Sequence, residues 1–562
     1  MRGRGGDPAA FRRIARSRGA AWVCVYLALA ACGEGGRRDA AAGDGAPVRG
    51  GTLVIASPTD LDYANPLVSG EVLTHELLRN ALLMPLIRYD TALEYQPWLA
   101  RSWEMLGDTG VVFHLRDDVY WHDGVRTTAY DVAFTYERAI DPETAFPNVG
   151  NFFAHWGAVE VLDSFTVRFS FEPHVDPLAS LPFFAIVPRH VLDSIPPARL
   201  REARFNTHPV GNGPFRFVER RPNDRWIFEA NPDFPEELGG RPYVDRLVWR
   251  VIPESTGQIA ELLSGHAHLV VSPPGSQLRE LDARPGIHAV VRPSRQYQFI
   301  VWNGRRAPFD DPRVRRALMM GMDRQEILTV LRGGYGQLAA GPIYPSHWAY
   351  PDSIAPLPFD PAAARALLAE VGFTDRNGDG TVENADGTEL RFALTIPAAV
   401  EFGRNVAEMV QADLAAIGVE MSVRAVDGNT MIANLLSPQR EFDAALLAWE
   451  GDLRLNLVDT FHSSALGQPF QMASYSNAEV DRLLDRATTV TDRAAAIPIW
   501  HRIQAIMRDE QPWGFFFYVP DLFLASDRLH GVEMDIRGPF ITLPWWWLAD
   551  GGGAGDTVVG ED

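Results

Sequence analysis

A chain of 562 residues is too long for one hydrophobic core, so the sequence is expected to fold as two or three lobes. Its composition, with 46% hydrophobic and 22% charged residues, is that of a folded globular protein and excludes a disordered one. The 72 acidic against 52 basic side chains give a net charge of −20, which excludes a nucleic-acid-binding protein and a protein held on an anionic membrane by charge.

The N-terminal stretch has the organisation of a secretory signal. A basic segment at residues 2–18 precedes an apolar run at residues 20–31, which is too short to span a bilayer. The run ends in Leu29-Ala30-Ala31-Cys32, which looks like a lipobox, in which the cysteine is acylated and becomes the first residue. We therefore expect a lipoprotein signal peptide at residues 1–31 and a lipid anchor on Cys32, on the periplasmic or extracellular face of a membrane. A plain secretory signal is the alternative.

The segment after the cysteine predicts a tether and the start of a folded domain. Residues 32–50 are rich in Gly, Ala, Asp and Arg and have no large apolar side chain before Val48, which is typical of a flexible linker. Residues 52–56 then predict a first strand, and residues 72–83 predict a helix.

Residues 100–141 read ARSWEMLGDTGVVFHLRDDVYWHDGVRTTAYDVAFTYERAID. Alternation at residues 111–115 predicts a strand, His122-Asp123-Gly124 a tight turn, and Thr128 the N-cap of a helix with apolar side chains at helical spacing. His122 beside Asp123 suggests catalysis, but the sequence supplies no nucleophile to accompany them. We therefore expect a structural role for this pair.

Residues 209–265 predict a compact β-rich unit. Gly211 and Gly213 suit a turn that needs close backbone approach, and the residues that follow alternate as two strands of a hairpin. A third strand ends at Ile252-Pro253, and residues 256–263 predict a short amphipathic helix that stops at Gly265.

The next recognisable segment begins with a strand at residues 297–302. It continues as RRAPFDDPRVRRALMMGMDRQEILTVLRGG, in which Asp311 and Pro312 begin a pair of helices that ends at Gly333-Gly334.

A loop at residues 375–386 has the spacing of an EF-hand-like calcium loop. The residues at its ligand positions one, three, five, seven and twelve are Asp375, Asn377, Asp379, Thr381 (through its carbonyl) and Asp386. Position twelve holds Asp where a bidentate Glu is usual, and no flanking helix pair is apparent. A structural Ca²⁺ site and an Asx/Gly-rich loop without an ion therefore both stay open.

The last third of the chain predicts a second α/β unit. A strand at residues 390–396, a helix at 406–417 and a strand at 419–426 form a βαβ unit. A buried strand at residues 442–448 then runs into Trp449-Glu450-Gly451-Asp452. Two further helices and the buried strand WGFFFYVP follow.

In this order, the segments at 100–141, 209–265 and 303–334 resemble the oligopeptide- and dipeptide-binding proteins of ABC importers, which are extracellular solute-binding proteins of family 5. The resemblance covers nearly all of residues 50–548 and implies an α/β fold, a two-lobed clamp of the periplasmic-binding-protein type whose larger lobe carries an insertion subdomain. The domains expected from it are a large-lobe core at 51–72, 205–298 and 525–548, an insertion at 73–204, a second lobe at 299–524 and a disordered tail at 549–562.

The resemblance further implies a monomeric binding protein, not an enzyme, that captures peptides between its lobes and delivers them to a membrane permease. The family's anchor for the peptide ammonium is the aspartate of a Trp-x-x-Asp motif, which corresponds here to Asp452, with Trp449 and Gly451 beside it. Tyr297, Phe152 and Phe153 are further candidates to line the cleft. Family members carry similar calcium-type loops, some of them with Ca²⁺.

The identity of the solute stays open at this point. The residues after Asp452, Leu-Arg-Leu-Asn, depart from the family's usual continuation. Members of the family also carry oligosaccharides, nickel complexes and opines, so these are alternative solutes. A secreted hydrolase is a further alternative from another class.

Overall fold

The computed structural model describes residues 46–146, 152–153, 155–174, 176–398, 400–451 and 455–549. The expected signal peptide with Cys32, most of the tether, Asp452 and the tail from residue 550 lie outside the described residues. None of the helices in the described ranges combines the length and the apolar composition that crossing a bilayer requires.

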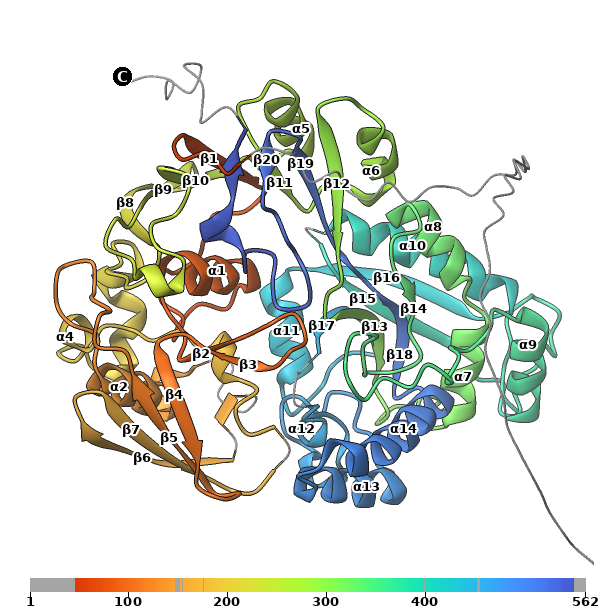
Figure 1. The fold of residues 1–562 in the computed structure, drawn as a ribbon. Coiled ribbons are helices and arrows are strands. Elements are labelled where there is room, and N and C mark those ends of the chain that lie inside the picture. Colours follow the sequence, from red (N-terminus) through yellow and green to blue (C-terminus); the bar gives the residue numbers. More distant parts are fainter. Residues whose placement is uncertain are drawn as a thin grey trace, which may run out of the picture. The chain divides into compact units, whose positions relative to one another are not determined.

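Seven strands form the first sheet, in the order β12–β19–β11–β1–β10–β9–β8 (Figure 1). Their bounds are β1 (Thr52–Ser57), β8 (Phe215–Arg221), β9 (Arg225–Ala230), β10 (Arg246–Val251), β11 (Leu269–Val271), β12 (Ile287–Arg292) and β19 (Asp521–Ser526). Strand β1 runs parallel to both β10 and β11, while β8 and β9 form the predicted antiparallel hairpin. Trp226 and Trp249 are opposite each other on β9 and β10, and both are fully buried. Helices α5 (Ser255–Leu263) and α6 (Gly275–Asp282) pack beside β11 and β12.

The chain between β1 and β8 forms an insertion with its own antiparallel sheet, in the order β4–β5–β7–β6 (Figure 1). Its elements are α1 (Val72–Leu77), β2 (Ile87–Tyr89), β3 (Tyr95–Pro97), β4 (Ala100–Met105), β5 (Gly110–Leu115), α2 (Ala129–Ile140), β6 (Trp156–Asp163), β7 (Thr166–Phe171) and α4 (Arg189–Leu192). Helix α2 packs on β6 and β7 and begins at a capping box, in which the Thr128 N–H donates to Asp131 Oδ2 at 2.8 Å. We call the first sheet and this insertion the large lobe.

Six strands form the other large sheet, in the order β14–β18–β13–β17–β15–β16. Their bounds are β13 (Gln296–Trp302), β14 (Gln337–Leu338), β15 (Arg391–Pro397), β16 (Glu420–Val426), β17 (Ala444–Glu450) and β18 (Trp513–Tyr518). Strands β15 and β16 are parallel and are joined by α10 (Glu401–Ala416), which confirms the predicted βαβ unit. We call this sheet and its helices the second lobe.

Helices cover both faces of the second-lobe sheet, so its strands read as nearly continuous apolar runs. Along β13, Ile300 and Trp302 belong to one core, and Phe299 and Val301 belong to the core on the opposite face. The helices are α7 (Pro312–Met320), α8 (Arg324–Arg332), α9 (Pro361–Glu370), α10, α11 (Gly428–Leu436), α12 (Val458–Phe461), α13 (Ala478–Thr489) and α14 (Arg493–Glu510).

The chain passes between the two large sheets twice, through residues 293–295 and 519–520. These crossings lie a few residues before the predicted boundaries at 298 and 524, because β13 already pairs with β17 from Gln296 and β19 pairs with β12 from Asp521. The two crossings are bonded to each other, since Ser294 Oγ donates to Val519 O at 2.6 Å and Val519 N donates to Gln296 O at 3.1 Å.

The His122 turn contacts the glycine-rich turn that precedes β8. The His122 backbone N–H donates to Gly211 O at 2.7 Å, and its Nε2 lies 3.0 Å from Gly213 O. A Cβ on Gly211 would lie 2.1 Å from Leu82 O and 2.9 Å from His122 Cε1, so only glycine fits there. His122 therefore joins two segments of the large lobe, as the structural hypothesis expects.

Candidate ligand-binding cleft

A cavity of about 460 Å³, here called the cleft, is lined by residues from both lobes. The large lobe contributes Gly70, Val72, His75, Glu76, Arg79, Phe152, Ala179, Ser180 and Phe183. The crossing and the second lobe contribute Arg295, Tyr297, Pro342, Ala448, Trp449, Glu450, Gly451, Leu455, Asn456, Leu457, Asp459, Thr460 and Phe470. This volume lies in the range of sites for small ligands.

The large-lobe wall of the cleft contains a buried ion pair. Arg79 Nη2 donates to Glu76 Oε2 at 2.6 Å and to Oε1 at 2.8 Å, and both residues are 6% exposed. Arg79 Nη1 also donates to Pro182 O at 3.2 Å. Burial lowers the pKa of Arg79, while the Glu76 carboxylate acts in the opposite direction. The pair lies where α1 passes into a π-helical turn at Leu78–Leu82, a distortion that is frequent at functional sites.

A second ion pair joins Arg295 to Glu450 on the opposite wall. It follows from the strand register, because β13 and β17 are antiparallel and place Gln296, the next residue, opposite Glu450. The guanidinium carbons of Arg295 and Arg79 lie 5.0 Å and 4.4 Å from the ring centroid of Phe183. One aromatic ring therefore contacts cations from both sides of the cleft.

Trp449 and Tyr297 are paired across β17 and β13, and both line the cleft. The half-buried Trp449 ring lies edge-on to Phe470 at 5.9 Å and to Trp513 at 5.7 Å, so it is held in a fixed orientation. Tyr297 is 1% exposed, and burial raises its pKa well above the ordinary value, so its hydroxyl stays protonated. These two side chains form an aromatic wall.

Gly451 ends this wall at a point where a side chain has no room. Its N–H donates to Arg295 O at 2.8 Å, and a Cβ would lie 2.5 Å from the ring of Tyr344. The next residue, Asp452, lies outside the described residues.

The two neighbouring phenylalanines of the insertion, Phe152 and Phe153, lie in different environments. Phe153, which the sequence suggested for the cleft, is 4% exposed and packs edge-on against Phe184 at 4.8 Å and Tyr136 at 5.1 Å. Phe152, which the sequence also suggested, does line the cleft. Sequence reasoning also missed Glu76, Arg79 and Arg295. Glu76 and Arg79 were missed because a Glu and an Arg three residues apart on a helix are more typical of a solvated face.

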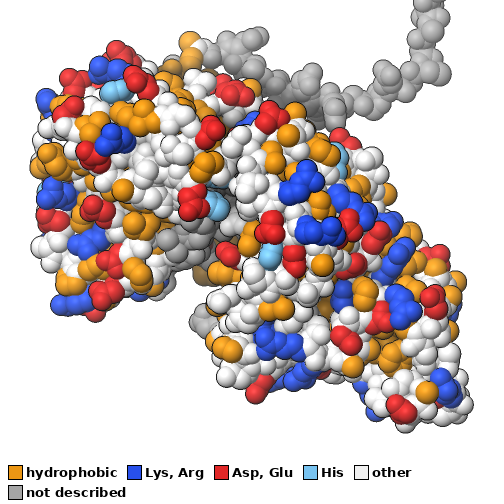
Figure 2. Space-filling view, turned by 90° about the horizontal axis from the view of Figure 1, so that it is seen from below, with side chains coloured by type: hydrophobic (Ala, Val, Ile, Leu, Met, Phe, Trp, Pro, Cys, Tyr) orange, Lys and Arg blue, Asp and Glu red, His pale blue; other side chains and the backbone are white. Residues whose placement is uncertain are grey.

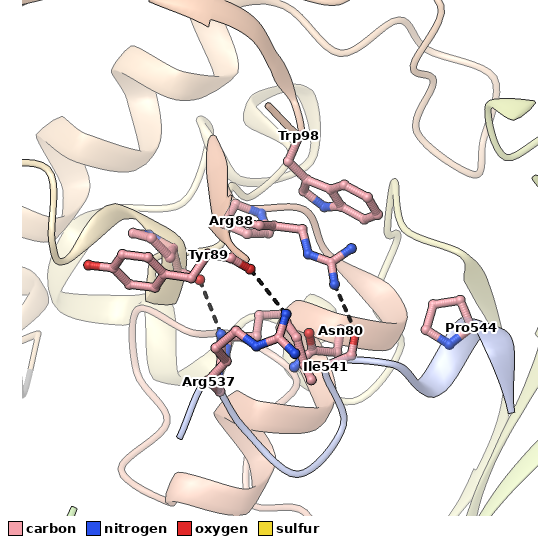
Figure 3. Close-up of a pocket in the computed structure, with 10 residues that line it drawn as sticks. Asn80, Arg88, Tyr89, Trp98, Arg537, Ile541 and Pro544 are labelled. Carbon is pink, nitrogen blue, oxygen red and sulfur yellow. Dashed lines mark hydrogen bonds between the residues drawn. The ribbon is translucent and has the colours of Figure 1, made fainter. Parts of the chain in front are cut away.

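A smaller cavity of about 10 Å³, with room for about one water molecule, shares Arg79 with the cleft. Within it, Arg88 Nη2 donates to Ile541 O at 2.8 Å, and the guanidinium stacks 4.1 Å from the centre of the Trp98 ring (Figure 3). Burial, together with the neighbouring Arg537 and Arg79, lowers the pKa of Arg88 to about 9. These contacts fasten the C-terminal segment to the large lobe.

The predicted calcium loop is exposed and forms its own hydrogen bonds. The Asp375 carboxylate accepts from Gly378 N at 2.7 Å and from Gly380 N at 3.1 Å, and Asp379 accepts from Thr381 N at 2.8 Å. Asn377 bonds to Asp379 in the same loop, while Asp386 belongs to a separate turn, where its N–H donates to Asn384.

One buried carboxylate lies beside this loop. Glu383 is 4% exposed, its Oε1 accepts from Arg376 N at 2.8 Å, and its Oε2 is buried without a hydrogen-bond partner. Across the described part of the chain, no three His, Cys, Asp or Glu side chains are grouped to hold a metal ion.

The acidic surplus of the chain is dispersed over its surface. Figure 2 shows acidic and basic side chains interspersed over the face drawn, with no broad area of one sign. Many are paired, as in the bond from Arg502 Nε to Glu479 Oε1 at 2.7 Å. The net charge of the chain therefore does not predict the charge of the cleft, which depends on the ion pairs that its own side chains form.

Comparisons with known proteins agree with this architecture. The model of the bacterial extracellular solute-binding proteins, family 5, matches residues 94–464. The oligopeptide-binding protein AppA of Bacillus subtilis is 28% identical over 534 residues, which are 94% of this chain and 97% of the relative. Its solved structure in complex with a nonapeptide matches with a TM-score of 0.77 at 28% identity and covers 90% of this chain and 100% of that one. Heme-binding protein A of Haemophilus influenzae is 29% identical over 444 residues, which are 75% of this chain and 78% of the relative.

Proposed function

Because the chain belongs to the bacterial extracellular solute-binding proteins of family 5, we propose that it captures peptides in the cleft and delivers them to the permease of an ABC importer. The observation that carries this proposal is the composition of the cleft, in which both lobes contribute charged pairs and aromatic faces to one volume of about 460 Å³. The relatives reported above are named as binding proteins, and AppA is named as an oligopeptide-binding protein.

Capture requires that the ligand stabilise the closed arrangement of the lobes more than the open one. A peptide can do this because its backbone and side chains can contact both walls at once. Trp449 offers a flat apolar face from the second lobe, and Phe183 with Arg79 lies on the large lobe. The lobe closure that results is the hinge type of transition found in periplasmic binding proteins.

We assign the peptide α-ammonium to Asp452, which directly follows the cleft residue Gly451 in the sequence. The support is the Trp-x-x-Asp spacing from Trp449 and the position beyond the carboxyl end of β17, since ligands of α/β sheets gather at that edge. A charge-assisted bond in a partly desolvated cleft is stronger than a neutral one.

Calorimetric titration tests the proposal, with peptides first identified by native mass spectrometry of the purified protein. Asp452→Asn is expected to weaken peptide binding by about 2–5 kcal/mol, the range for truncating one partner of a buried charge pair. Acetylation of the peptide amino terminus should weaken binding to the wild type and have far less effect on the variant. Binding of no peptide by the wild type would refute the peptide function.

A non-peptide solute is the second candidate. It is favoured by the departure of the sequence after Asp452 and by the similarity to a relative that is named for heme binding. Native mass spectrometry separates the two candidates, because it reports the mass of any co-purified ligand.

We further propose that the protein is a monomer tethered to the membrane by a lipid on Cys32. The support is the Leu29-Ala30-Ala31-Cys32 sequence after a basic and an apolar segment. A tether of this kind would keep the binding protein close to its permease and raise the effective concentration of one for the other.

A further inference from the structure

Asp459 is an acidic side chain of the cleft for which the described part of the chain provides no partner. It lies in α12 (Val458–Phe461), lines the cleft and is exposed. Among the described residues, no hydrogen bond or ion pair is made to its carboxylate. An Asp in this situation keeps its charge available for a ligand.

The other carboxylates of the described cleft are already neutralised. Glu76 is bonded to Arg79, and Glu450 is bonded to Arg295. The charged groups that line the cleft are thus three carboxylates and two guanidiniums, which leaves one negative charge, on Asp459. Residues 452–454 lie outside the described residues and are not counted.

The histidine of the cleft does not compensate this charge. His75 Nε2 lies 3.1 Å from Ser69 O, and burial lowers the pKa of the ring, so it stays neutral at pH 7. The aromatic rings of Trp449 and Phe470, 5.9 Å apart, line the same cavity. Aromatic faces attract cations through their quadrupole. The cleft therefore combines an unpaired carboxylate with cation-attracting surfaces.

We propose that Asp459 is a specificity-determining residue that selects peptides carrying a cationic side chain, with arginine preferred to lysine. This inference rests on the peptide function proposed above and adds a preference for one class of peptide. The planar guanidinium of arginine can donate two parallel hydrogen bonds to a carboxylate, which the ammonium of lysine cannot do. Asp459 is distinct from the α-ammonium anchor, because it lies seven positions after Asp452 in the sequence.

The test uses pairs of pentapeptides that differ only in charge. Each pair has one arginine in an otherwise alanine peptide, placed at each position in turn, and its partner has citrulline, which has nearly the same shape without the charge. For the best position, the wild type is expected to bind the arginine peptide about fivefold more tightly than the citrulline peptide. In Asp459→Asn this ratio should fall to within about twofold, with the citrulline peptide bound as by the wild type.

Two further variants separate specificity from structure. Asp459→Glu keeps the carboxylate and is expected to retain most of the preference for arginine. Asp352→Asn removes an exposed carboxylate that does not line the cleft and is expected to leave the ratio unchanged. Thermal melting of each variant checks that it is folded.

The outcomes are distinguishable. An arginine preference that persists in Asp459→Asn overturns the assignment of Asp459, and so does a wild type that binds both members of every pair equally. If the wild type binds neither member of any pair, and no other peptide, the proposed peptide function itself fails. A fall in the ratio at higher salt supports the inference, because screening weakens an exposed charge pair.

Discussion

Arg493, the first residue of α14, donates from Nε to both carboxylate oxygens of Asp176, at 2.9 Å and 3.1 Å. The two residues are 317 positions apart and belong to the second lobe and to the insertion of the large lobe. The Asp176 side chain is only 17% exposed, and Arg493 also lies over the ring of Trp348 at 5.7 Å. Asp176 is three residues before Ala179, which lines the cleft. This ion pair bridges the lobes near the cleft.

We predict that Arg493→Gln increases the separation of the lobes in the ligand-free protein. The variant loses a bridging ion pair that is worth up to about 1 kcal/mol, so the population of the open arrangement should rise. Small-angle X-ray scattering should report a larger radius of gyration without ligand, and calorimetry a weaker peptide affinity by about fivefold or less. Arg502→Gln, which breaks the pair with Glu479 inside the second lobe, is the control and should change neither quantity. Equal radii of gyration for Arg493→Gln and wild type would contradict the bridging role.

We predict that His122 makes stability depend on pH. Burial lowers its pKa from 6.5 to about 4 in the folded protein. Between these values the unfolded chain binds more protons than the folded one, so stability falls as the pH falls from about 6.5 to about 4. At pH 4.5 the loss is roughly 2–3 kcal/mol relative to pH 7.

Urea unfolding at both pH values measures this loss, and His122→Gln is the comparison, because glutamine can still donate to Gly213 O but does not titrate. Other groups titrate equally in both proteins. The wild type should therefore lose roughly 2–3 kcal/mol more than the variant between pH 7 and pH 4.5. Identical losses in the two proteins would show that His122 does not contribute.

We predict that Gly211→Ala destabilises the large lobe by roughly 2–4 kcal/mol or more, because the new Cβ would overlap Leu82 O, a backbone atom that cannot rotate away. Gly428→Ala is the matched control. Gly428 is the first residue of α11, and a Cβ there would meet no atom within 4 Å. This control should stabilise the protein by about 0.4–1 kcal/mol. A Gly211→Ala protein with wild-type unfolding in urea would argue against the packing described here.

We predict weak calcium binding at the loop of Asp375, Asn377, Asp379, Thr381 and Asp386. Position twelve holds Asp in place of a bidentate Glu, so a dissociation constant of about 0.1–1 mM is expected. Calcium at 10 mM would then raise the melting temperature, since only the folded state binds it. Asp375→Asn should abolish the shift. Melting curves that coincide with calcium and with chelator would leave the loop without an ion.

We predict that Cys32→Ala releases the protein from the membrane fraction, because the lipid would have no attachment point. Cys24→Ala is the control, since Cys24 would be removed with the signal peptide and its loss should not affect anchoring. Cell fractionation followed by immunoblotting reads out both variants. Retention of Cys32→Ala in membranes would refute the anchor.

Local patterns were sufficient for the secondary structure but only partly sufficient for the cleft. The hairpin β8–β9 and the βαβ unit of β15, α10 and β16 were predictable, because their apolar spacing reports which face is buried. Trp449 was predictable from a motif next to a buried strand, and Tyr297 from its place at the crossover between the lobes. The choice between Phe152 and Phe153 was not, since both are apolar neighbours and only tertiary packing decides which side chain enters the core.

The ion pairs of the cleft show a further limit of sequence reasoning. Glu76 and Arg79 have the spacing of a solvated helical pair. They are buried because segments far along the chain, Pro182–Phe183 and the region of Arg537, fold over them. Likewise, Arg295 meets Glu450 through a strand register that spans 155 positions. No local signal encodes such contacts.

The two crossings between the sheets have a mechanical consequence. Residues 293–295 and 519–520 are short, each contains a proline, Pro293 or Pro520, and they are bonded to each other. Proline fixes its own φ, which removes one backbone torsion from each crossing. Two short segments that are bonded side by side allow the lobes to rotate about one axis and resist a twist of one lobe relative to the other. A longer or bulkier solute should therefore change the angle between the two lobes in the closed state. The alignment of one lobe with the other should stay the same.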